Sequence, residues 1–295
     1  MMQEVTEKKL TIRDLSLSFG GVQALRKVSL EISAHSITGL IGPNGAGKTS
    51  LFNCLTGFYR PNEGSISLYQ SSGSQVDIND LIGMMPRAKG TRGPLALGKT
   101  IWYRFFGGTY LVARAGIART FQNIRLFPEM TVLENLLVAQ HRFMKTRILG
   151  GLLGLQAFRD EEQGFIREAI DWLDFVDLKA DAHRLAKTLP YGHQRKLEIA
   201  RAMATRPELL CLDEPAAGLN PKETQELGIL IRRIRDQFGV AVVMIEHDMG
   251  LVMDLCDEII VLNFGEVIAS GKPAEIRKNP KVLAAYLGEE DDDGR

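Results

Sequence analysis

The feature that most constrains the fold is a glycine-rich segment, Gly42-Pro-Asn-Gly-Ala-Gly-Lys-Thr49, which matches the pattern G-x-x-x-x-G-K-[ST]. The apolar run 36–41 precedes it, and a helical pattern follows it. In this context the glycines let the backbone approach a phosphate closely, and N–H groups at the helix N-terminus point at the anion. The segment therefore predicts a phosphate-binding loop between a buried strand and a helix in an α/β fold.

The residue types of this loop indicate its ligand. Lys48 supplies a positive charge for the β- and γ-phosphates of a nucleotide, and Thr49 offers a hydroxyl to Mg²⁺, which also binds substrate phosphates and water. The predicted nucleotide-binding positions are Gly42, Pro43, Asn44, Gly45, Ala46, Gly47, Lys48, Thr49 and Ser50.

Two later apolar runs are followed by ionisable residues. The run 209–212 ends in Asp213 and Glu214, and the run 240–245 precedes His247 by one residue. Ligands gather where the carboxyl ends of parallel strands meet. We expect Asp213 to hold Mg²⁺, Glu214 to orient or deprotonate an attacking water, and His247 to donate a hydrogen bond to the γ-phosphate. Because strand side chains alternate, we expect Glu214 to point away from Asp213.

Hydrophobic periodicity divides the chain into three kinds of structure. Residues 10–33 alternate with period two around Gly20-Gly21, which predicts an antiparallel hairpin that the run 64–69 joins. Residues 131–205 have helical spacing and open with the capping-box pattern Thr131-x-x-Glu134. Beyond Pro207, continuous apolar runs separated by helices predict a parallel sheet covered on both faces.

Composition excludes several classes of protein. Thirty-six Lys and Arg balance thirty-six Asp and Glu, so net charge gives no support for binding nucleic acid. Cys54, Cys211 and Cys256 lie far apart without C-x-x-C spacing, which disfavours a zinc ribbon and fits a reducing compartment. The N-terminus has no secretory pattern, and no window approaches about 18 apolar residues, so we expect any membrane role to be peripheral.

Residues 81–128 contain eight Lys or Arg and no Asp or Glu, with an aromatic cluster at Trp102, Tyr103, Phe105, Phe106 and Tyr110. One interpretation is a flexible surface insertion. The other is that the aromatic side chains rest on a membrane partner or the lipid interface while the bases face anionic headgroups. The five acids of Glu289–Asp293 predict a solvated, disordered end.

The order of these motifs resembles the ATPase subunit of an ABC transporter. The motifs are the phosphate loop, Gln122 in Thr-Phe-Gln-Asn, the run Leu189-Pro-Tyr-Gly-His-Gln194, Leu-Asp-Glu before residue 215, and His247. Longer stretches, among them RTFQNIRLFPEMTVLENLLVAQH, LDEPAAGLNPKETQEL and NPKVLAAYLG, resemble the ATP-binding subunit of bacterial branched-chain amino acid importers over about residues 10–288.

The resemblance implies a P-loop NTPase parallel-sheet core with an N-terminal antiparallel β subdomain and an inserted helical subdomain. It places the ATP-binding domain at 8–288, the helical subdomain at about 130–205, a basic and aromatic insertion at about 81–114, and an acidic tail at 289–295.

The resemblance also assigns roles to individual residues. Phe19 matches the aromatic residue that stacks on adenine, although a core-facing strand residue is an alternative. Gln122 matches the glutamine that reaches Mg²⁺ and the attacking water. Four residues match the signature motif, whose N–H groups grip the γ-phosphate bound by the opposite subunit: Tyr191, Gly192, His193 and Gln194.

Three positions depart from the family pattern. Pro190 stands where Ser is common, which removes a hydroxyl and an N–H that could contact phosphate. Tyr191 stands for a glycine. Asn220 stands where Asp is frequent, but Asn220-Pro221-x-Glu223 also reads as a capped helix start.

The resemblance implies an ATP-hydrolysing, energy-coupling subunit of a branched-chain amino acid importer, with ATP and Mg²⁺ as cofactors and a peripheral place on the cytoplasmic face of the inner membrane. The implied partners are a second ATPase subunit, identical or different, two transmembrane permease subunits and, indirectly, a periplasmic solute-binding protein, with no nucleic acid. Alternatives are a related ABC system for urea, amides or lipopolysaccharide export, a soluble non-transport ABC ATPase, and a P-loop kinase.

Overall fold

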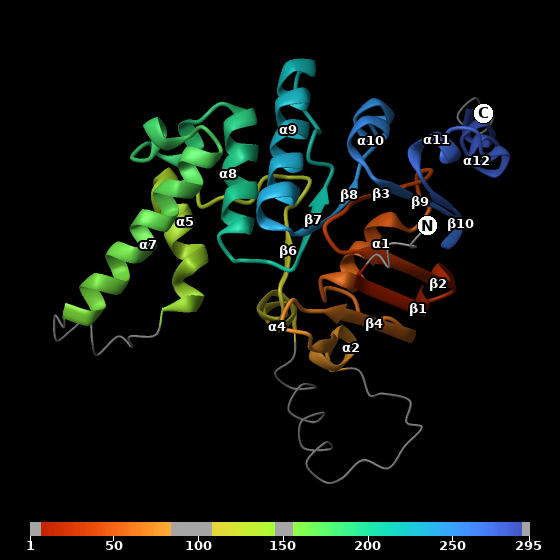
Figure 1. Cartoon of the computed structure of the whole chain (residues 1–295). Helices are drawn as coiled ribbons and strands as arrows, with labels where there is room; N and C mark the ends of the chain where they lie inside the picture. Colours follow the sequence, from red (N-terminus) through yellow and green to blue (C-terminus); the bar gives the residue numbers. More distant parts are fainter. Residues whose placement is uncertain (1–6, 84–107, 145–155, 291–295) are drawn as a thin grey trace, which may run out of the picture. The chain divides into compact units, whose positions relative to one another are not determined.

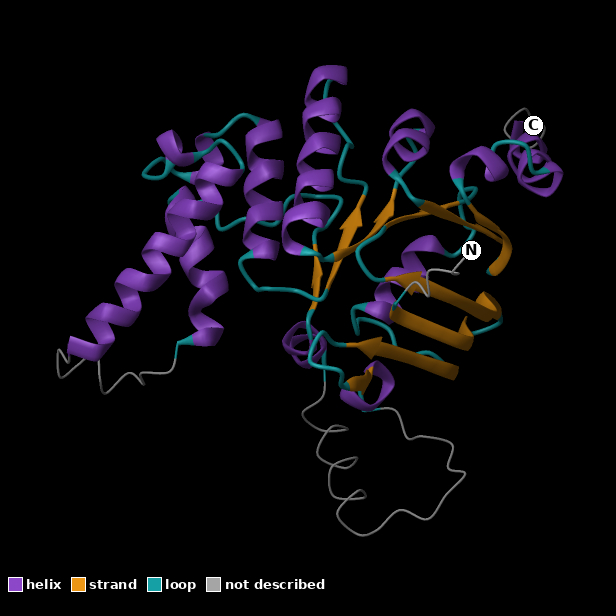
Figure 2. Cartoon of the chain, viewed as in Figure 1, coloured by secondary structure: helices purple, strands orange, loops and turns teal. Residues whose placement is uncertain are grey.

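The computed structural model describes residues 7–83, 108–144 and 156–290. Its contacts divide the chain into a first unit of residues 1–119, 208–214 and 231–295, and a second unit of residues 120–207 and 215–230. The strands shown in Figures 1 and 2 are β1 (Lys8–Phe19), β2 (Val22–Ser33), β3 (Ile37–Ile41), β4 (Glu63–Tyr69), β5 (Gln75–Asp77), β6 (Ile117–Arg119), β7 (Leu209–Asp213), β8 (Ala241–Ile245), β9 (Glu258–Asn263) and β10 (Glu266–Gly271).

The α-helices are α1 (Lys48–Leu55), α2 (Ile78–Leu81), α4 (Thr109–Ala115), α5 (Val132–Gln140), α7 (Gln156–Phe175), α8 (Tyr191–Met203), α9 (Pro221–Phe238), α10 (Met249–Leu255), α11 (Pro273–Ile276) and α12 (Pro280–Glu290). Short 3₁₀ turns cover His141–Phe143, Lys179–Asp181 and Ala186–Thr188.

In the first unit, an antiparallel sheet has the order β2-β1-β4-β5. The predicted hairpin is confirmed, because β1 pairs antiparallel with β2, with Leu10 opposite Ile32. Along its other edge β1 pairs with β4, with Leu10 opposite Leu68. The hairpin turns at Gly20, whose φ is +57°. These alternating apolar side chains are buried, so the sheet has one face in the core.

The second sheet of this unit has the order β10-β9-β3-β8-β7-β6. Strands β9, β3, β8, β7 and β6 run parallel, while β10 returns antiparallel to β9. The parallel sheet predicted from continuous apolar runs is confirmed, because β3, β7 and β8 are buried at every position. The sequence patterns did not predict β6 and β10.

Helix α1 packs between the two sheets of the first unit (Figure 1). Its Leu51, Phe52 and Leu55 are at most 1% exposed and share one core cluster with Cys211 of β7 and Val243 of β8. Fully burying each such side chain contributes about 1.5–3 kcal/mol. The core therefore fixes the helix that begins at the end of the phosphate loop.

The opposite face of β3 is covered closely by α10. A Cβ atom on Gly39 would lie 2.9 Å from the Sγ of Cys256 and 3.2 Å from Val252. Cys54, Cys211 and Cys256 are all free and buried. Burial raises the pKa of each of these thiols to about 12.

The second unit contains α5, α7 and α8. The predicted capping box is confirmed, since the Thr131 hydroxyl accepts from the Glu134 N–H and the Glu134 carboxylate accepts from the Thr131 N–H. Arg195 of α8 is fully buried and pairs with Glu198 at 2.8 Å. Burial raises the pKa of Glu198, and the Arg195 charge opposes that rise.

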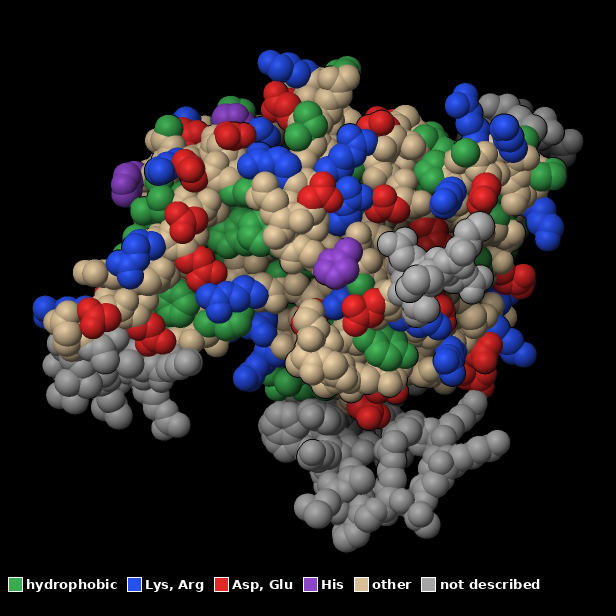
Figure 3. Space-filling model, in the orientation of Figure 1, with side chains coloured by type: hydrophobic (Ala, Val, Ile, Leu, Met, Phe, Trp, Pro, Cys, Tyr) green, Lys and Arg blue, Asp and Glu red, His purple; other side chains and the backbone are tan. Residues whose placement is uncertain are grey.

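Four further findings bear on the sequence predictions. On the face in Figure 3, basic and acidic side chains are interspersed. Within the described ranges, no helix is both long and apolar enough to cross a bilayer. Trp102, Tyr103, Phe105 and Phe106 lie outside the described residues, whereas Tyr110 lies in α4 and is half exposed. Helix α12 continues through Glu290, and residues 291–295 lie outside the described part.

Candidate functional site

The glycine-rich loop connects β3 to α1 through left-handed glycines. The φ angles are +148° at Gly42, +74° at Gly45 and +103° at Gly47. A Cβ on Gly42 would lie 2.0 Å from the Leu262 carbonyl oxygen, and one on Gly47 would lie 2.6 Å from the Ala24 carbonyl oxygen. Both the dihedral angles and the close packing therefore require glycine at positions 42 and 47.

Lys48 begins α1 and is only 7% exposed. Its ammonium donates to the carbonyl oxygens of Gly42 at 2.5 Å and Pro43 at 2.8 Å. The lysine ammonium, a positively charged group, therefore lies against the backbone of the phosphate loop. That charge and the N-terminus of α1 together favour an anion there.

Two carboxylates follow β7 and have different partners. Asp213 is the last strand residue, whereas Glu214 lies beyond the strand with a φ of +46°. The Glu214 N–H donates to the Ile245 carbonyl at 2.9 Å, which ties the ends of β7 and β8 together. The explanation by strand alternation is wrong, because a left-handed residue, and not the pleat, redirects the Glu214 side chain.

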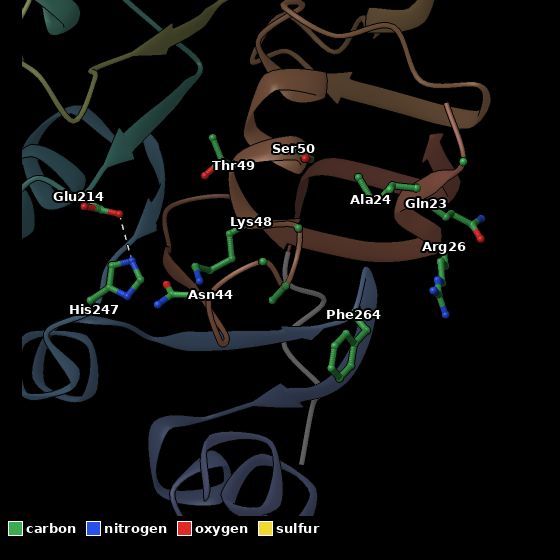
Figure 4. A pocket seen from close by; sticks show the side chains of 15 residues that line it. Gln23, Ala24, Arg26, Asn44, Lys48, Thr49, Ser50, Glu214, His247 and Phe264 are labelled. Carbon is green, nitrogen blue, oxygen red and sulfur yellow. Dashed lines mark hydrogen bonds and ion pairs between the residues drawn. The ribbon is translucent and has the colours of Figure 1, made fainter. Parts of the chain in front are cut away.

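Glu214 and His247 form a pair at the carboxyl end of the sheet. The Glu214 Oε1 lies 3.0 Å from the His247 Nε2 (Figure 4). An ionised carboxylate only accepts hydrogen bonds, so Nε2 carries the hydrogen when Glu214 is charged. The His247 side chain, which is half exposed, therefore orients the Glu214 carboxylate.

Asp213 is held by a residue that the sequence reasoning missed. The Arg119 guanidinium donates to Asp213 Oδ2 at 2.6 Å, with side-chain exposures of 8% and 11%. It also donates to Asn53 Oδ1 at 2.7 Å and to Thr56 Oγ1 at 3.1 Å, both on or next to α1. Arg119 thus links the acidic end of β7 to the helix that follows the phosphate loop.

A cavity of about 520 Å³ lies between the phosphate loop and the Glu214–His247 pair, and its lining does not include the predicted residues Gly42, Pro43 and Asp213. It brings together predicted residues Asn44 to Ser50 with Glu214 and His247, and it adds others that the sequence did not indicate (Figure 4). The full lining is Gly21, Val22, Gln23, Ala24, Arg26, Asn44, Gly45, Ala46, Gly47, Lys48, Thr49, Ser50, Glu214, His247 and Phe264.

The predicted adenine platform, Phe19, is not part of this lining. It is about half exposed, and its ring contacts Tyr59 edge to face, with centroids 5.0 Å apart. Its stacking role remains a prediction.

The signature residues belong to the second unit. Pro190 is the N-cap of α8 and supplies no side-chain hydrogen bond, as expected for a proline in place of serine. Tyr191 is 42% exposed, while a Cβ on Gly192 would lie 2.7 Å from Glu223 Oε1. The His193 Nδ1 lies 3.7 Å from the Asp181 Oδ2. The Gln194 side-chain amide donates to the Leu189 carbonyl oxygen at 2.9 Å.

Two further predicted positions lie in the second unit. The Gln122 carbonyl accepts from the buried Arg195 at 2.8 Å, which fixes the backbone at this glutamine. The capped helix start at Asn220 is confirmed, since its Oδ1 accepts from the N–H groups of Lys222 and Glu223, each at 3.0 Å.

A strand–glycine loop–helix unit with Lys48 at the loop, and with Asp213 and Glu214 at the carboxyl end of β7 in the same parallel sheet, defines a P-loop nucleotide-binding protein. A solved structure of the same kind, the ADP conformation of the ATP-binding cassette MJ1267, matches with a TM-score of 0.71 and 28% identity over 96% of this chain and all of that one.

Comparisons with family models and with known proteins show to which family of P-loop nucleotide-binding proteins the chain belongs. Residues 25–217 match the family model described as ABC transporter, and residues 266–292 match the one described as branched-chain amino acid ATP-binding cassette transporter. The chain belongs to the ABC transporter family, as the motif order predicted. It is 47% identical to the BraF high-affinity branched-chain amino acid transport ATP-binding protein of Pseudomonas aeruginosa, over 95% of this chain and 98% of that protein. It is also 46% identical to the LivG high-affinity branched-chain amino acid transport ATP-binding protein of Salmonella typhimurium, over 97% of this chain and 100% of that protein.

Proposed function

We propose that this chain is the ATP-hydrolysing, energy-coupling subunit of an importer for branched-chain amino acids. The full-length similarity to BraF and LivG supports the transport role and the cargo. The observation that carries the catalytic part is the single cavity that places the phosphate loop beside the Glu214–His247 pair. A group that binds phosphate and a group that activates water then face one ligand.

Lys48 and the loop account for binding of the triphosphate. The ammonium exchanges its bonds to the Gly42 and Pro43 carbonyls for bonds to phosphate oxygens, which are stronger because both partners are charged. Asn44 and Thr49, both exposed, line the cavity where these oxygens lie. Replacing Lys48 by Ala should remove most of the nucleotide affinity.

The donor set fits Mg²⁺. This cation prefers oxygen ligands and keeps several waters and substrate phosphates, so few protein ligands suffice. Thr49 offers a hydroxyl and Asp213 a carboxylate, of which Oδ2 is already oriented by Arg119. Gln122 is the third proposed ligand. A magnesium ion held by these residues would supply positive charge against the triphosphate.

Glu214 performs the proton transfer. A water oxygen attacks the γ-phosphorus while Glu214 accepts the water proton, and the bond from that phosphorus to the ADP oxygen breaks to give ADP and phosphate. In this proposal His247 keeps the Glu214 carboxylate aimed through its Nε2 contact, and it lies near the γ-phosphate when ATP is bound.

The signature residues Tyr191–Gln194 imply a second ATPase subunit. In this proposal the signature of one copy closes on the γ-phosphate held by the other, so ATP stabilises a closed dimer and its hydrolysis opens it. Two permease subunits convert this cycle into transport, with a periplasmic solute-binding protein delivering cargo. The chain works from the cytoplasmic face of the membrane.

A paired experiment tests the catalytic part. Glu214→Gln should bind ATP, release no phosphate and remain a dimer in size-exclusion chromatography with ATP, because only the proton acceptor is lost. Glu31→Gln, on β2, is the matched control: the Glu31 side chain is about half exposed and pairs with Lys8, so the variant should hydrolyse ATP like the unmodified protein. Normal turnover in Glu214→Gln would remove Glu214 from the chemistry.

Cargo is tested separately. The chain is purified with its membrane partners and reconstituted in vesicles that contain ATP, and uptake of labelled leucine, isoleucine and valine is compared with uptake of urea. Uptake of the three amino acids supports the proposal, whereas uptake of urea alone contradicts it.

A further inference from the structure

An unusual residue occupies the tight turn between β9 and β10. The two turn residues, Phe264 and Gly265, both have positive φ, +44° and +80°, and Asn263 pairs with Glu266 across the hairpin. This is the pattern of a type I′ turn, whose first position favours Asn, Asp or Gly. A bulky aromatic residue with a left-handed backbone is an outlier at such a position.

Packing of the hairpin does not account for the aromatic ring. Phe264 is 75% exposed, the most exposed of the large hydrophobic side chains described. Neither the turn nor the core therefore gains from a phenyl group there. Strained positions that persist without structural benefit often mark functional sites.

The turn is fixed to the phosphate loop. The Gly265 N–H donates to the Ala46 carbonyl at 3.0 Å, and the Arg26 N–H donates to the Gly265 carbonyl at 2.8 Å. A Cβ on Gly47 would lie 3.5 Å from the Gly265 Cα. Phe264 thus projects from a point held directly against the loop.

Phe264 lines the same cavity as the loop. In Figure 4 the Glu214–His247 pair lies on one side of Lys48, while Phe264 and Arg26 lie on the other. If hydrolysis occurs at Glu214, the γ-phosphate is at that end. The remainder of the nucleotide then extends along the loop toward Gln23, Arg26 and Phe264.

We propose that Phe264 is a nucleotide-binding residue whose ring contacts the sugar and base of the bound nucleotide. The inference rests on the proposed function, because it requires ATP or ADP in this cavity. An aromatic face fits any base, so this contact adds affinity without selecting adenine strongly. The role complements or replaces the one predicted for Phe19, whose ring contacts Tyr59.

The test separates base contacts from phosphate contacts. Binding of ADP, which has a base, and of pyrophosphate, which has none, is measured by calorimetry on the full chain. Phe264→Asn should weaken ADP binding about tenfold, or about 1.4 kcal/mol, and change pyrophosphate binding less than twofold. Because Asn suits this turn better than Phe, the melting temperature of the Phe264→Asn variant without nucleotide should not fall below that of the wild type.

Matched variants complete the design. Phe264→Tyr keeps the aromatic face and should restore ADP affinity, while Phe238→Asn, at the exposed end of α9, should leave it unchanged. Unchanged ADP affinity in Phe264→Asn overturns the proposal, as does an equal loss for pyrophosphate, which would mean that the turn supports the loop. Loss of all base-dependent affinity in Phe19→Ala with none in Phe264→Asn also overturns it. A wild-type chain that binds neither ADP nor pyrophosphate refutes the proposed function instead.

Discussion

Replacing Arg119 by Met should destabilise the protein strongly, because it leaves the Asp213 carboxylate buried without its counter-charge. The two side chains are 8% and 11% exposed and 2.6 Å apart, so the surrounding water compensates little. Removing one partner of a buried ion pair typically costs about 3–5 kcal/mol. Met fills a similar volume, so little of this cost comes from a cavity.

The origin of this cost is measurable in a double-mutant cycle with Asp213→Asn. The neutral amide needs no counter-charge, so Arg119→Met combined with Asp213→Asn should be more stable than Arg119→Met alone, by about 1–3 kcal/mol. Thermal unfolding followed by circular dichroism gives each melting temperature, and we expect Arg119→Met to melt about 10 °C lower than the wild type. Strict additivity of the two substitutions, or a loss below about 1 kcal/mol in Arg119→Met, would refute the assignment of Arg119 as the counter-ion.

Three further predictions concern the rest of the first unit. The three buried cysteines have pKa values of about 12, so they should not react with a thiol reagent at pH 8 until the protein is unfolded. The absorbance change on adding the reagent, measured with folded and with unfolded protein, checks this. Gly47→Ala should lower stability by about 2 kcal/mol or more and weaken ADP binding, because φ is +103° and the new Cβ would lie 2.6 Å from the Ala24 carbonyl oxygen. Thermal unfolding measures the stability, and calorimetry measures the ADP affinity. Wild-type values for both would contradict the close packing at Gly47. Burial alone would raise the pKa of Glu208, but hydrogen bonds from Lys9 and Ser71 outweigh it and hold that pKa below its usual 4.5. The folded carboxyl therefore stabilises the protein above pH 4.5 and loses this contribution as pH falls through the lowered pKa, so urea titrations of Glu208→Gln should show a weaker fall of stability in acid than the wild type.

Local sequence patterns sufficed for features that depend on neighbouring residues. The phosphate loop follows from spacing within eight residues, and the capping box at Thr131 and the cap at Asn220 each follow from four. Strands β3, β7 and β8 are buried on both faces, so their apolar runs were continuous and unambiguous. These elements alone place Lys48 and Glu214 at one edge of the sheet.

Features that depend on tertiary contacts did not follow from the sequence. Strand β6 has only three residues, too few for a periodic pattern, so the pairing of Arg119 with Asp213 94 positions away gave no signal. Phe264 lines the cavity only because its turn is bonded to Ala46, more than two hundred residues earlier. The Asn263-Phe-Gly265 run marks a turn, but not the surface that the turn reaches.

The central claim is that each copy of the chain holds only part of an active site and that ATP joins two copies. Disulfide crosslinking tests it most directly, with Asn44→Cys in one copy and Tyr191→Cys in the other; both positions are exposed, and the native cysteines are buried. When the two variants are mixed under oxidising conditions, a linked dimer should form rapidly with ATP and slowly with ADP. A mixture that hydrolyses ATP yet forms no such link at saturating ATP would contradict the account.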